Sequence, residues 1–105
     1  MALTRSFKET VKERARCDPA FRVGLLQKAV EAFLRSELDL GKILLRDYIN
    51  ATVGFEDLAE ATHKSPKSLM RMLSAEGNPR ADNLFSVLAH LQKNEGIALD
   101  VRTRP

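Results

Sequence analysis

The sequence predicts an all-α, five-helix domain with a short C-terminal β-strand. Three observations lead to this fold class. Apolar residues recur at spacings of three and four through most of the chain, which is the period of an amphipathic helix. Helix-start signals, such as Asp18 followed by Pro19 and Ser65 followed by Pro66, separate the periodic stretches. The chain of 105 residues has the length of one small domain, and no stretch has the composition of a linker.

The first two helices are predicted from the beginning of the chain to Leu38. A helix over residues 4–16 carries Phe7, Val11 and Ala15 at a spacing of four. Asp18 is the predicted N-cap of the second helix, because its carboxylate can accept hydrogen bonds from the first free N–H groups. The inward stripe of this second helix is continuous and consists of Phe21, Leu25, Leu26, Ala29, Val30, Phe33 and Leu34.

A third helix is expected to begin directly afterwards, with Asp39 as its N-cap. Its predicted inward face consists of Leu40, Ile43, Leu44 and Tyr48. Arg46 and Asp47 lie on the other side of a helical wheel and are expected to face solvent. Together, residues 1–53 should form helices that pack on the core or extend it.

Residues 54–105 contain shorter elements. We expect a helix over residues 56–62, a second one that follows Ser65 and stops at Gly77, and a fifth helical unit over residues 81–93. The inward residues of this fifth unit are Leu84, Val87, Leu88 and Leu91. Residues 97–102 alternate between apolar and other side chains, which predicts one short strand. No partner strand is apparent in the chain, so pairing with the same strand of a second subunit is an attractive hypothesis.

Positive charge is concentrated in two blocks. The formal net charge is +3, and the apolar fraction of 44% is ordinary for a globular protein. Residues 1–17 contain five basic and two acidic side chains, and residues 64–80 contain four basic and one acidic. Residues 37–60 have the opposite balance, with six acids and two bases. The two basic blocks favour an anionic partner such as nucleic acid.

Other classes of protein are not expected. No apolar run approaches the ~20 residues of a membrane-spanning helix, and the N-terminus lacks the apolar segment of a signal peptide, so we expect a cytoplasmic protein without membrane contact. The single cysteine, Cys17, and the two histidines, His63 and His90, are not at metal-ligand spacing. Because no nucleophile motif or phosphate-binding loop is found either, we expect no enzymatic activity and no cofactor or metal.

Residues 55–77 have the pattern of a helix-turn-helix. This motif needs two short helices whose inner faces pack, while the outer face of the second helix stays free for the major groove of DNA. The expected inner residues are Leu58, Ala59, Leu69, Met72 and Leu73. The second helix presents Lys67, Ser68, Met70 and Arg71 outward, and an arginine in this position can pair with the edge of a guanine.

This pattern resembles a known family. The residues that carry the resemblance are 55–62, the Ser-capped run 64–73, Gly77-Asn78-Pro79 and the Leu-rich run 83–88. They resemble the Xre-type, phage-repressor-like transcriptional regulators and, more closely, the HigA-like antitoxins of addiction modules. The resemblance covers residues 48–101. It implies an all-helical fold, a homodimer on a palindromic operator, autoregulation, and often a small RelE-like toxin as partner.

The family usually has a glycine in the turn, where this chain has His63. A left-handed backbone there costs a non-glycine residue about 1 kcal/mol, although histidine tolerates it better than β-branched residues. The predicted DNA-contacting residues are Lys64, Ser65, Lys67, Ser68, Met70, Arg71, Asn78 and Arg80. Among them, Lys64, Lys67 and Ser68 are expected to contact phosphate, and Arg71 with Lys67 to contact bases.

Two interpretations of the function therefore stay open. In the first, the chain is a sequence-specific regulator that binds double-stranded DNA as a homodimer and acts as an antitoxin-like repressor. In the second, it is a protein-interaction module whose stripe over residues 21–34 docks a partner, with no direct reading of bases. The basic residues of the first helix are either a solvated face or phosphate contacts.

Overall fold

The computed structural model describes residues 5–105 and contains six α-helices in that range. They are α1 (Arg5–Cys17), α2 (Pro19–Leu34), α3 (Leu38–Ala51), α4 (Phe55–Thr62), α5 (Pro66–Met72) and α6 (Ala81–Glu95). The predicted all-α class is confirmed, whereas the predicted number of five helices is wrong. The two short helices expected within residues 55–77 are both present, and the left-handed backbone of His63 ends α4 before α5 begins.

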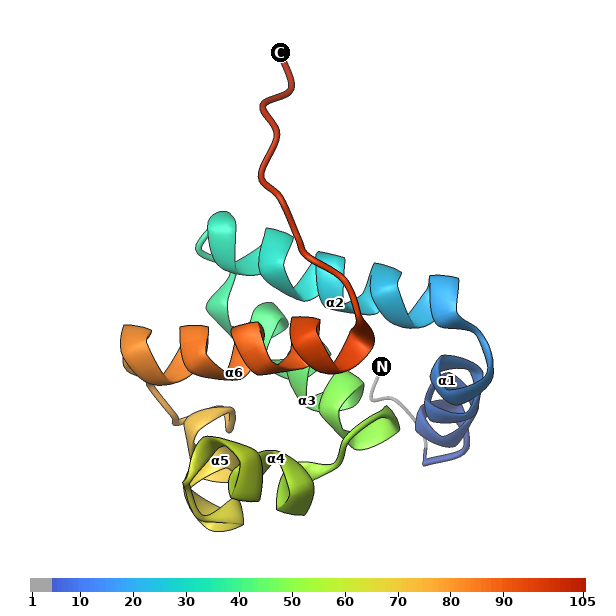
Figure 1. Ribbon diagram of the computed structural model, residues 1–105. Helices are drawn as coiled ribbons and strands as arrows, with labels where there is room; N and C mark the ends of the chain where they lie inside the picture. Colours follow the sequence, from blue (N-terminus) through green and yellow to red (C-terminus); the bar gives the residue numbers. More distant parts are fainter. Residues whose placement is uncertain (1–4) are drawn as a thin grey trace.

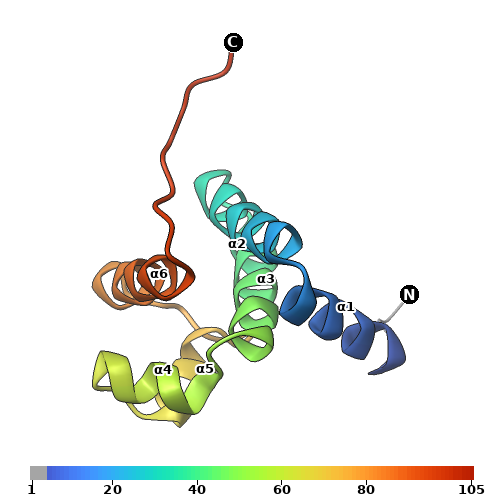
Figure 2. The same cartoon turned by 45° about the vertical axis from the view of Figure 1, so that its right-hand side comes forward.

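α3 is the central element of the fold. It contacts α1, α2 and α4, while α6 packs on α4. Figure 2 shows α1 and α2 on one side of the molecule and α4, α5 and α6 on the other. The buried core runs through this junction and includes side chains from every helix between α2 and α6. None of the helices within residues 5–105 is long and apolar enough to cross a membrane.

Three helices end with the same hydrogen-bond pattern. After α2, α4 and α6, a residue with positive φ turns the chain, and two backbone N–H groups bond back to carbonyls of the last helical turn. Glycine usually occupies the left-handed position, as Gly96 does after α6, but Ser36 and His63 occupy it after α2 and α4. After α4, the Lys64 N–H donates to the Ala59 carbonyl at 2.9 Å. The left-handed turn considered for His63 is therefore present.

The second predicted helix is shorter than expected. It ends at Leu34, not near Leu38, because the left-handed Ser36 lets the Glu37 N–H bond the Ala32 carbonyl at 2.9 Å. The side chain of Asp18 caps the start of this helix as predicted, and accepts hydrogen bonds from the N–H groups of Ala20 and Phe21. Asp39 is not the cap of α3, because the helix begins at Leu38 and Glu37 is its N-cap.

The predicted inward face of α3 is partly wrong. Leu40 and Ile43 are 44% and 43% exposed, whereas Tyr48 is fully buried, as expected. The true inward face is rotated and includes Gly41, Lys42, Leu45 and Ile49. Gly41 lies against the ring of Phe33, where a Cβ atom would come within 2.7 Å of a ring carbon. The close crossing of α2 and α3 at Gly41 therefore decides which side of α3 is buried.

Several other positions also differ from the expectation. Arg46 and Asp47 are half-buried and not fully exposed, because α3 has neighbours on more than one side. Phe7 and Leu34 are 52% and 64% exposed. The predicted inner residues of the helix-turn-helix are confirmed: Leu58, Ala59, Leu69 and Leu73 are buried and Met72 is half-buried.

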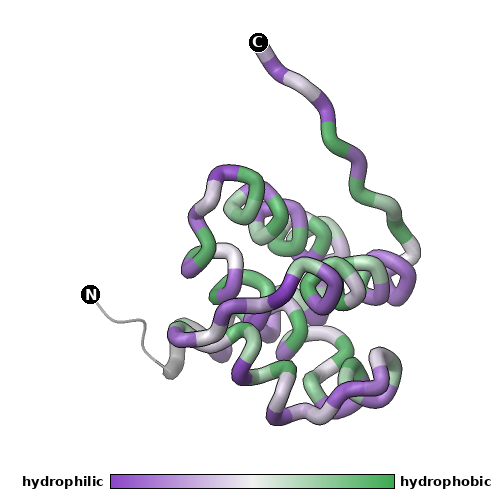
Figure 3. The backbone as a smooth tube through the Cα atoms, turned by 90° about the vertical axis from the view of Figure 1, so that its left-hand side faces the viewer, coloured by the Kyte–Doolittle hydropathy of each residue, from purple (hydrophilic) through white to green (hydrophobic). Residues whose placement is uncertain are grey.

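The predicted C-terminal strand is absent from the described chain. Residues 97–105 leave the end of α6 and extend away from the helices (Figure 1). Ile97 and Leu99 pack partly against the core, while Val101 is 77% exposed. Figure 3 shows the alternation of apolar and polar residues along this tail. A strand needs a neighbour for its ladder of hydrogen bonds, and the described residues of one chain provide none beside the tail.

A polar network joins three helices at one end of the core. Arg22 Nε of α2 donates to both carboxylate oxygens of Glu95 in α6, at 2.8 and 3.0 Å, and Tyr48 Oη of α3 donates to the same carboxylate. The hydrogen bonds from Arg22 hold the pKa of Glu95 below its usual range. Burial, together with the bond to Glu95, raises the pKa of the Tyr48 hydroxyl above its usual range. Arg22 also donates to the carbonyl of Ala15, so α1 is tied to the same network.

Candidate nucleic-acid interface

The second helix of the helix-turn-helix, α5, has seven residues and well-defined ends. Ser65 is its N-cap, with Oγ accepting a hydrogen bond from the Ser68 N–H at 3.0 Å. Pro66 follows at the first helical position, where no N–H is needed. The helix ends at Met72, so the prediction that it continues to Gly77 is wrong. Residues 73–77 instead form a tight loop that returns toward the core.

The two faces of α5 are clearly different. Leu69 is fully buried and Leu73, just after the helix, is 1% exposed. Lys67, Ser68 and Arg71 are exposed, and Met70 is 49% exposed. Met70 therefore lies on the same open face as the basic residues, as predicted. We call this open face, which consists of Lys67, Ser68, Met70 and Arg71, the α5 outer face.

A polar hollow lies beside the α5 outer face, between the turn after α4 and the start of α6. Its volume is about 600 Å³. Of the eight predicted DNA-contacting residues, five line this hollow: Lys64, Ser68, Arg71, Asn78 and Arg80. The other three, Ser65, Lys67 and Met70, are not part of its lining. The hollow therefore collects residues from the turn, from α5 and from the segment before α6.

Three of these residues already have protein partners. Ser68 Oγ accepts a hydrogen bond from Ser65 Oγ at 2.9 Å. Lys64 Nζ donates to Asn83 Oδ1 at 2.7 Å, and the lysine is half-buried. Arg80 forms an exposed ion pair with Asp82, in which Nε lies 3.4 Å from a carboxylate oxygen. Lys64 thus joins the turn to the first residues of α6. An ammonium group has three N–H donors, so this bond leaves donors on Lys64 for a phosphate.

Six further residues that were not predicted to contact DNA also line the hollow, namely His63, Met72, Glu76, Gly77, Pro79 and Asn83. Asn83 is the most informative of them because it holds Lys64. The distance of 19 positions between the two residues gave no hint that they meet.

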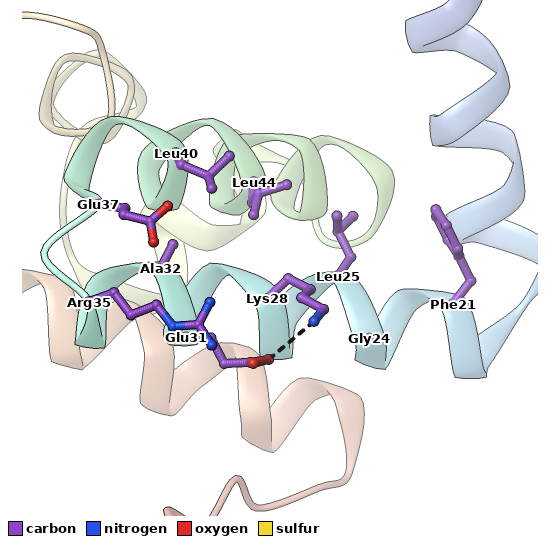
Figure 4. Close-up of a pocket in the computed structure, with 10 residues that line it drawn as sticks. All are labelled: Phe21, Gly24, Leu25, Lys28, Glu31, Ala32, Arg35, Glu37, Leu40 and Leu44. Carbon is purple, nitrogen blue, oxygen red and sulfur yellow. Dashed lines mark ion pairs between the residues drawn. The ribbon is translucent and has the colours of Figure 1, made fainter.

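A second surface has the opposite character. An apolar groove of about 410 Å³ lies between α2 and α3. Figure 4 shows Leu25 of α2 and Leu40 and Leu44 of α3 directed into the space between the two helices. Charged side chains border it, including Lys28 and Glu31, whose charged atoms are 3.8 Å apart. Of the stripe that was predicted to dock a partner, only Phe21 and Leu25 line this groove, whereas Leu26 and Ala29 are buried in the core.

No protein-family model, curated protein or solved structure matches this chain.

Proposed function

We propose that this chain is a sequence-specific regulator that binds double-stranded DNA with α5 in the major groove. The observation that carries the proposal is the separation of the two faces of α5. Leu69 and Leu73 are buried, while the α5 outer face stays exposed and carries Lys67 and Arg71. A short helix that packs on the core through one face and carries basic residues on the opposite face suits insertion into the major groove of DNA, which is about 12 Å wide.

The roles of the residues follow from their positions. Lys64, Ser68 and Arg80 border the hollow beside α5 and would contact the phosphate backbone, which fixes the register of the protein on the duplex. Arg71 and Lys67 would contact base edges, where each good contact contributes about 1 to 3 kcal/mol of discrimination. Ser65 acts through its N-cap bond to α5 and is not free for a base.

This proposal predicts that Lys67→Ala combined with Arg71→Ala weakens binding to the DNA upstream of the chain's own gene by at least about 30-fold. The estimate corresponds to about 2 kcal/mol for the loss of two contacts. The measurement is fluorescence anisotropy with that duplex and with a scrambled duplex of equal length. Both replaced side chains are exposed, so the free energy of unfolding should hardly change.

A matched control removes the same formal charge from other surfaces. Lys28→Ala combined with Lys93→Ala replaces two exposed lysines outside the hollow, on α2 and at the end of α6. This variant should lose only the weak, salt-dependent attraction that any two surface charges contribute. If the two double variants and the original chain bound the upstream duplex with equal affinity, this result would contradict direct reading of bases by α5.

We further propose that the protein acts as a homodimer and that its extended tail forms the missing strand with a second copy. The Leu99 N–H donates to Gln92 Oε1 at 2.7 Å, toward the body of the protein. Successive N–H groups of an extended chain point to opposite sides, so the Asp100 N–H faces the free edge. An antiparallel ribbon between the tails of two copies would provide a hydrogen-bond acceptor for this N–H. It would also set the two α5 helices about one helical turn of DNA apart.

The expected effect of Asp100→Pro is at least a 10-fold weaker dimer, because proline removes the N–H at the free edge in both copies. Asp100→Thr is the matched control, since threonine keeps the N–H and favours extended backbone. Sedimentation equilibrium measures both dissociation constants. A monomeric chain at working concentration, or equal dissociation constants for the two variants, would count against the ribbon.

The apolar groove supports a second candidate function. As the resemblance implies, a small RelE-like toxin would be the partner of an antitoxin-like repressor, and the groove formed by Leu25, Leu40 and Leu44 is the surface most suited to one of its helices. If the chain bound such a toxin but did not distinguish the upstream duplex from the scrambled one, the interaction module would be favoured over the DNA-binding regulator.

A further inference from the structure

Lys42 is a charged residue that lies buried in the protein. It lies in α3, and its residue exposure is 5%. The ammonium Nζ donates to the carbonyl of Gly77 at 2.8 Å and to the carbonyl of Ala75 at 3.3 Å. Its third polar neighbour is the exposed carboxylate of Asp39, at 3.5 Å. A buried charge needs such partners, and two of the three are backbone carbonyls of the loop after α5.

A second cation from α3 approaches the same loop. Arg46 lies one helical turn after Lys42, and its Nη1 donates to the carbonyl of Leu73 at 3.3 Å. Lys42 and Arg46 therefore bind, from a different element, three backbone carbonyls of the loop that follows α5.

The loop that accepts these hydrogen bonds, residues 73–77, is also packed very closely against α5. A Cβ atom on Gly77 would come within 2.1 Å of the Arg71 carbonyl oxygen and within 2.6 Å of the Met72 carbonyl oxygen. The Gly77 N–H donates to the Ser74 carbonyl at 3.0 Å, which closes the loop on itself. Because of this contact, a shift of residues 73–77 would move the last turn of α5 as well.

From this geometry we infer that Lys42 is a positioning residue for DNA reading. With seven residues, α5 has about two turns, so its direction depends on what holds each end. Ser65 and the turn hold the start, while Lys42 holds the loop that fixes the other end. Arg71 lies near the C-terminal end of α5, so the position of its guanidinium relative to a base edge depends on Lys42. The inference rests on the proposed function and adds to it a residue 29 positions away from Arg71.

The test compares Lys42→Met with the original chain in two measurements. Methionine keeps the length and apolar stem of lysine but donates no hydrogen bond to the loop. We expect at least a 10-fold loss of affinity for the upstream duplex and less than a 3-fold change for the scrambled duplex, because the phosphate contacts of Lys64 and Arg80 do not depend on the angle of α5. Stoichiometric titration at high concentration gives the fraction of binding-competent protein, so partial unfolding cannot imitate a change in the ratio of the two affinities.

Three further variants separate positioning from general stability. Lys42→Arg keeps a cation and should recover most of the affinity ratio. Arg46→Met removes the second cation from a half-buried position and should change the ratio in the same direction by a smaller factor. Asp39→Asn removes only the carboxylate partner, which is 87% exposed, and should leave the ratio unchanged. An affinity ratio in Lys42→Met equal to that of the original chain would overturn the inference.

A measurement without DNA distinguishes failure of the inference from failure of the proposed function. Amide hydrogen exchange should become at least 10-fold faster in residues 73–77 of Lys42→Met than in the original chain, with little change in α2. If exchange in the loop stays unchanged, Lys42 does not position α5 and the inference is wrong. If the loop loosens but the original chain does not distinguish the two duplexes, the proposed function fails and the reading role of Lys42 fails with it.

Discussion

Replacing Glu95 with alanine should lower the free energy of unfolding by about 3 kcal/mol, the lower end of the range for breaking a buried ion pair. The side chain of Glu95 is 8% exposed and that of Arg22 is 20% exposed. Without Glu95, little water could therefore reach the Arg22 guanidinium to replace the lost hydrogen bonds. The Tyr48 hydroxyl would lose its acceptor as well. The estimate stays at the lower end because Arg22 retains its hydrogen bond to the Ala15 carbonyl. Urea denaturation followed by circular dichroism measures the change.

Two variants make this result specific to the network. Glu60→Ala removes an exposed glutamate from a helix surface and should change the free energy of unfolding by less than about 0.5 kcal/mol. Glu95→Gln keeps the shape of Glu95 but cannot ionise. Since the pKa of Glu95 is lowered in the folded state, the stability that its charge contributes is present above the ordinary value of 4.5. The advantage of the original chain over Glu95→Gln should therefore shrink as the pH falls below 4.5, and a constant difference down to acid pH would contradict the role of the charge.

The second large effect is expected at Gly77. Gly77→Ala would place a methyl group against the carbonyl oxygens of Arg71 and Met72, and these backbone atoms cannot rotate away as a side chain could. We expect a loss of about 3 kcal/mol of stability, the upper end of the range for overpacking. The same variant should weaken binding to the upstream duplex more than to the scrambled one, because the loop that holds α5 must move.

Gly24 is the matched control for this substitution. It lies inside α2, and a Cβ atom built there meets no atom within 4 Å. Alanine is the better helix former, so Gly24→Ala should raise the free energy of unfolding by about 0.5 to 1 kcal/mol. If both substitutions had the same sign and size, the close contact at Gly77 would not be the cause of its effect.

Gly77 also illustrates what a sequence pattern leaves open. A glycine after an apolar helical stretch followed by Asn78 and Pro79 predicts the end of a helix, and the reading helix was expected to stop there. It ends at Met72 instead, and the glycine is needed for the close approach of the loop to α5. Both explanations require a residue without a side chain, so the sequence alone cannot distinguish a left-handed turn from a tight contact.

Most of the candidate interface was predictable because it depends on local signals. Ser65 with Pro66 marks the start of α5, and the spacing of Leu69 and Leu73 identifies its buried side. These two facts are enough to place Lys67, Ser68 and Arg71 on the outer face. The bond from Lys64 to Asn83 and the bonds from Lys42 to the loop were not predictable, because each joins residues 19 to 35 positions apart.

The sequence by itself determined the helical class, the caps at Asp18 and Ser65, and the outward residues of α5, because these features depend on neighbours within a few positions. The tertiary structure alone decided which face of α3 is buried, since the crossing of α2 over Gly41 rotates that face away from Leu40 and Ile43. It also decided that a lysine in α3 lies under the loop after α5. Periodicity ranks side chains by hydrophobicity and cannot foresee a buried charge whose partners are backbone carbonyls brought together by folding.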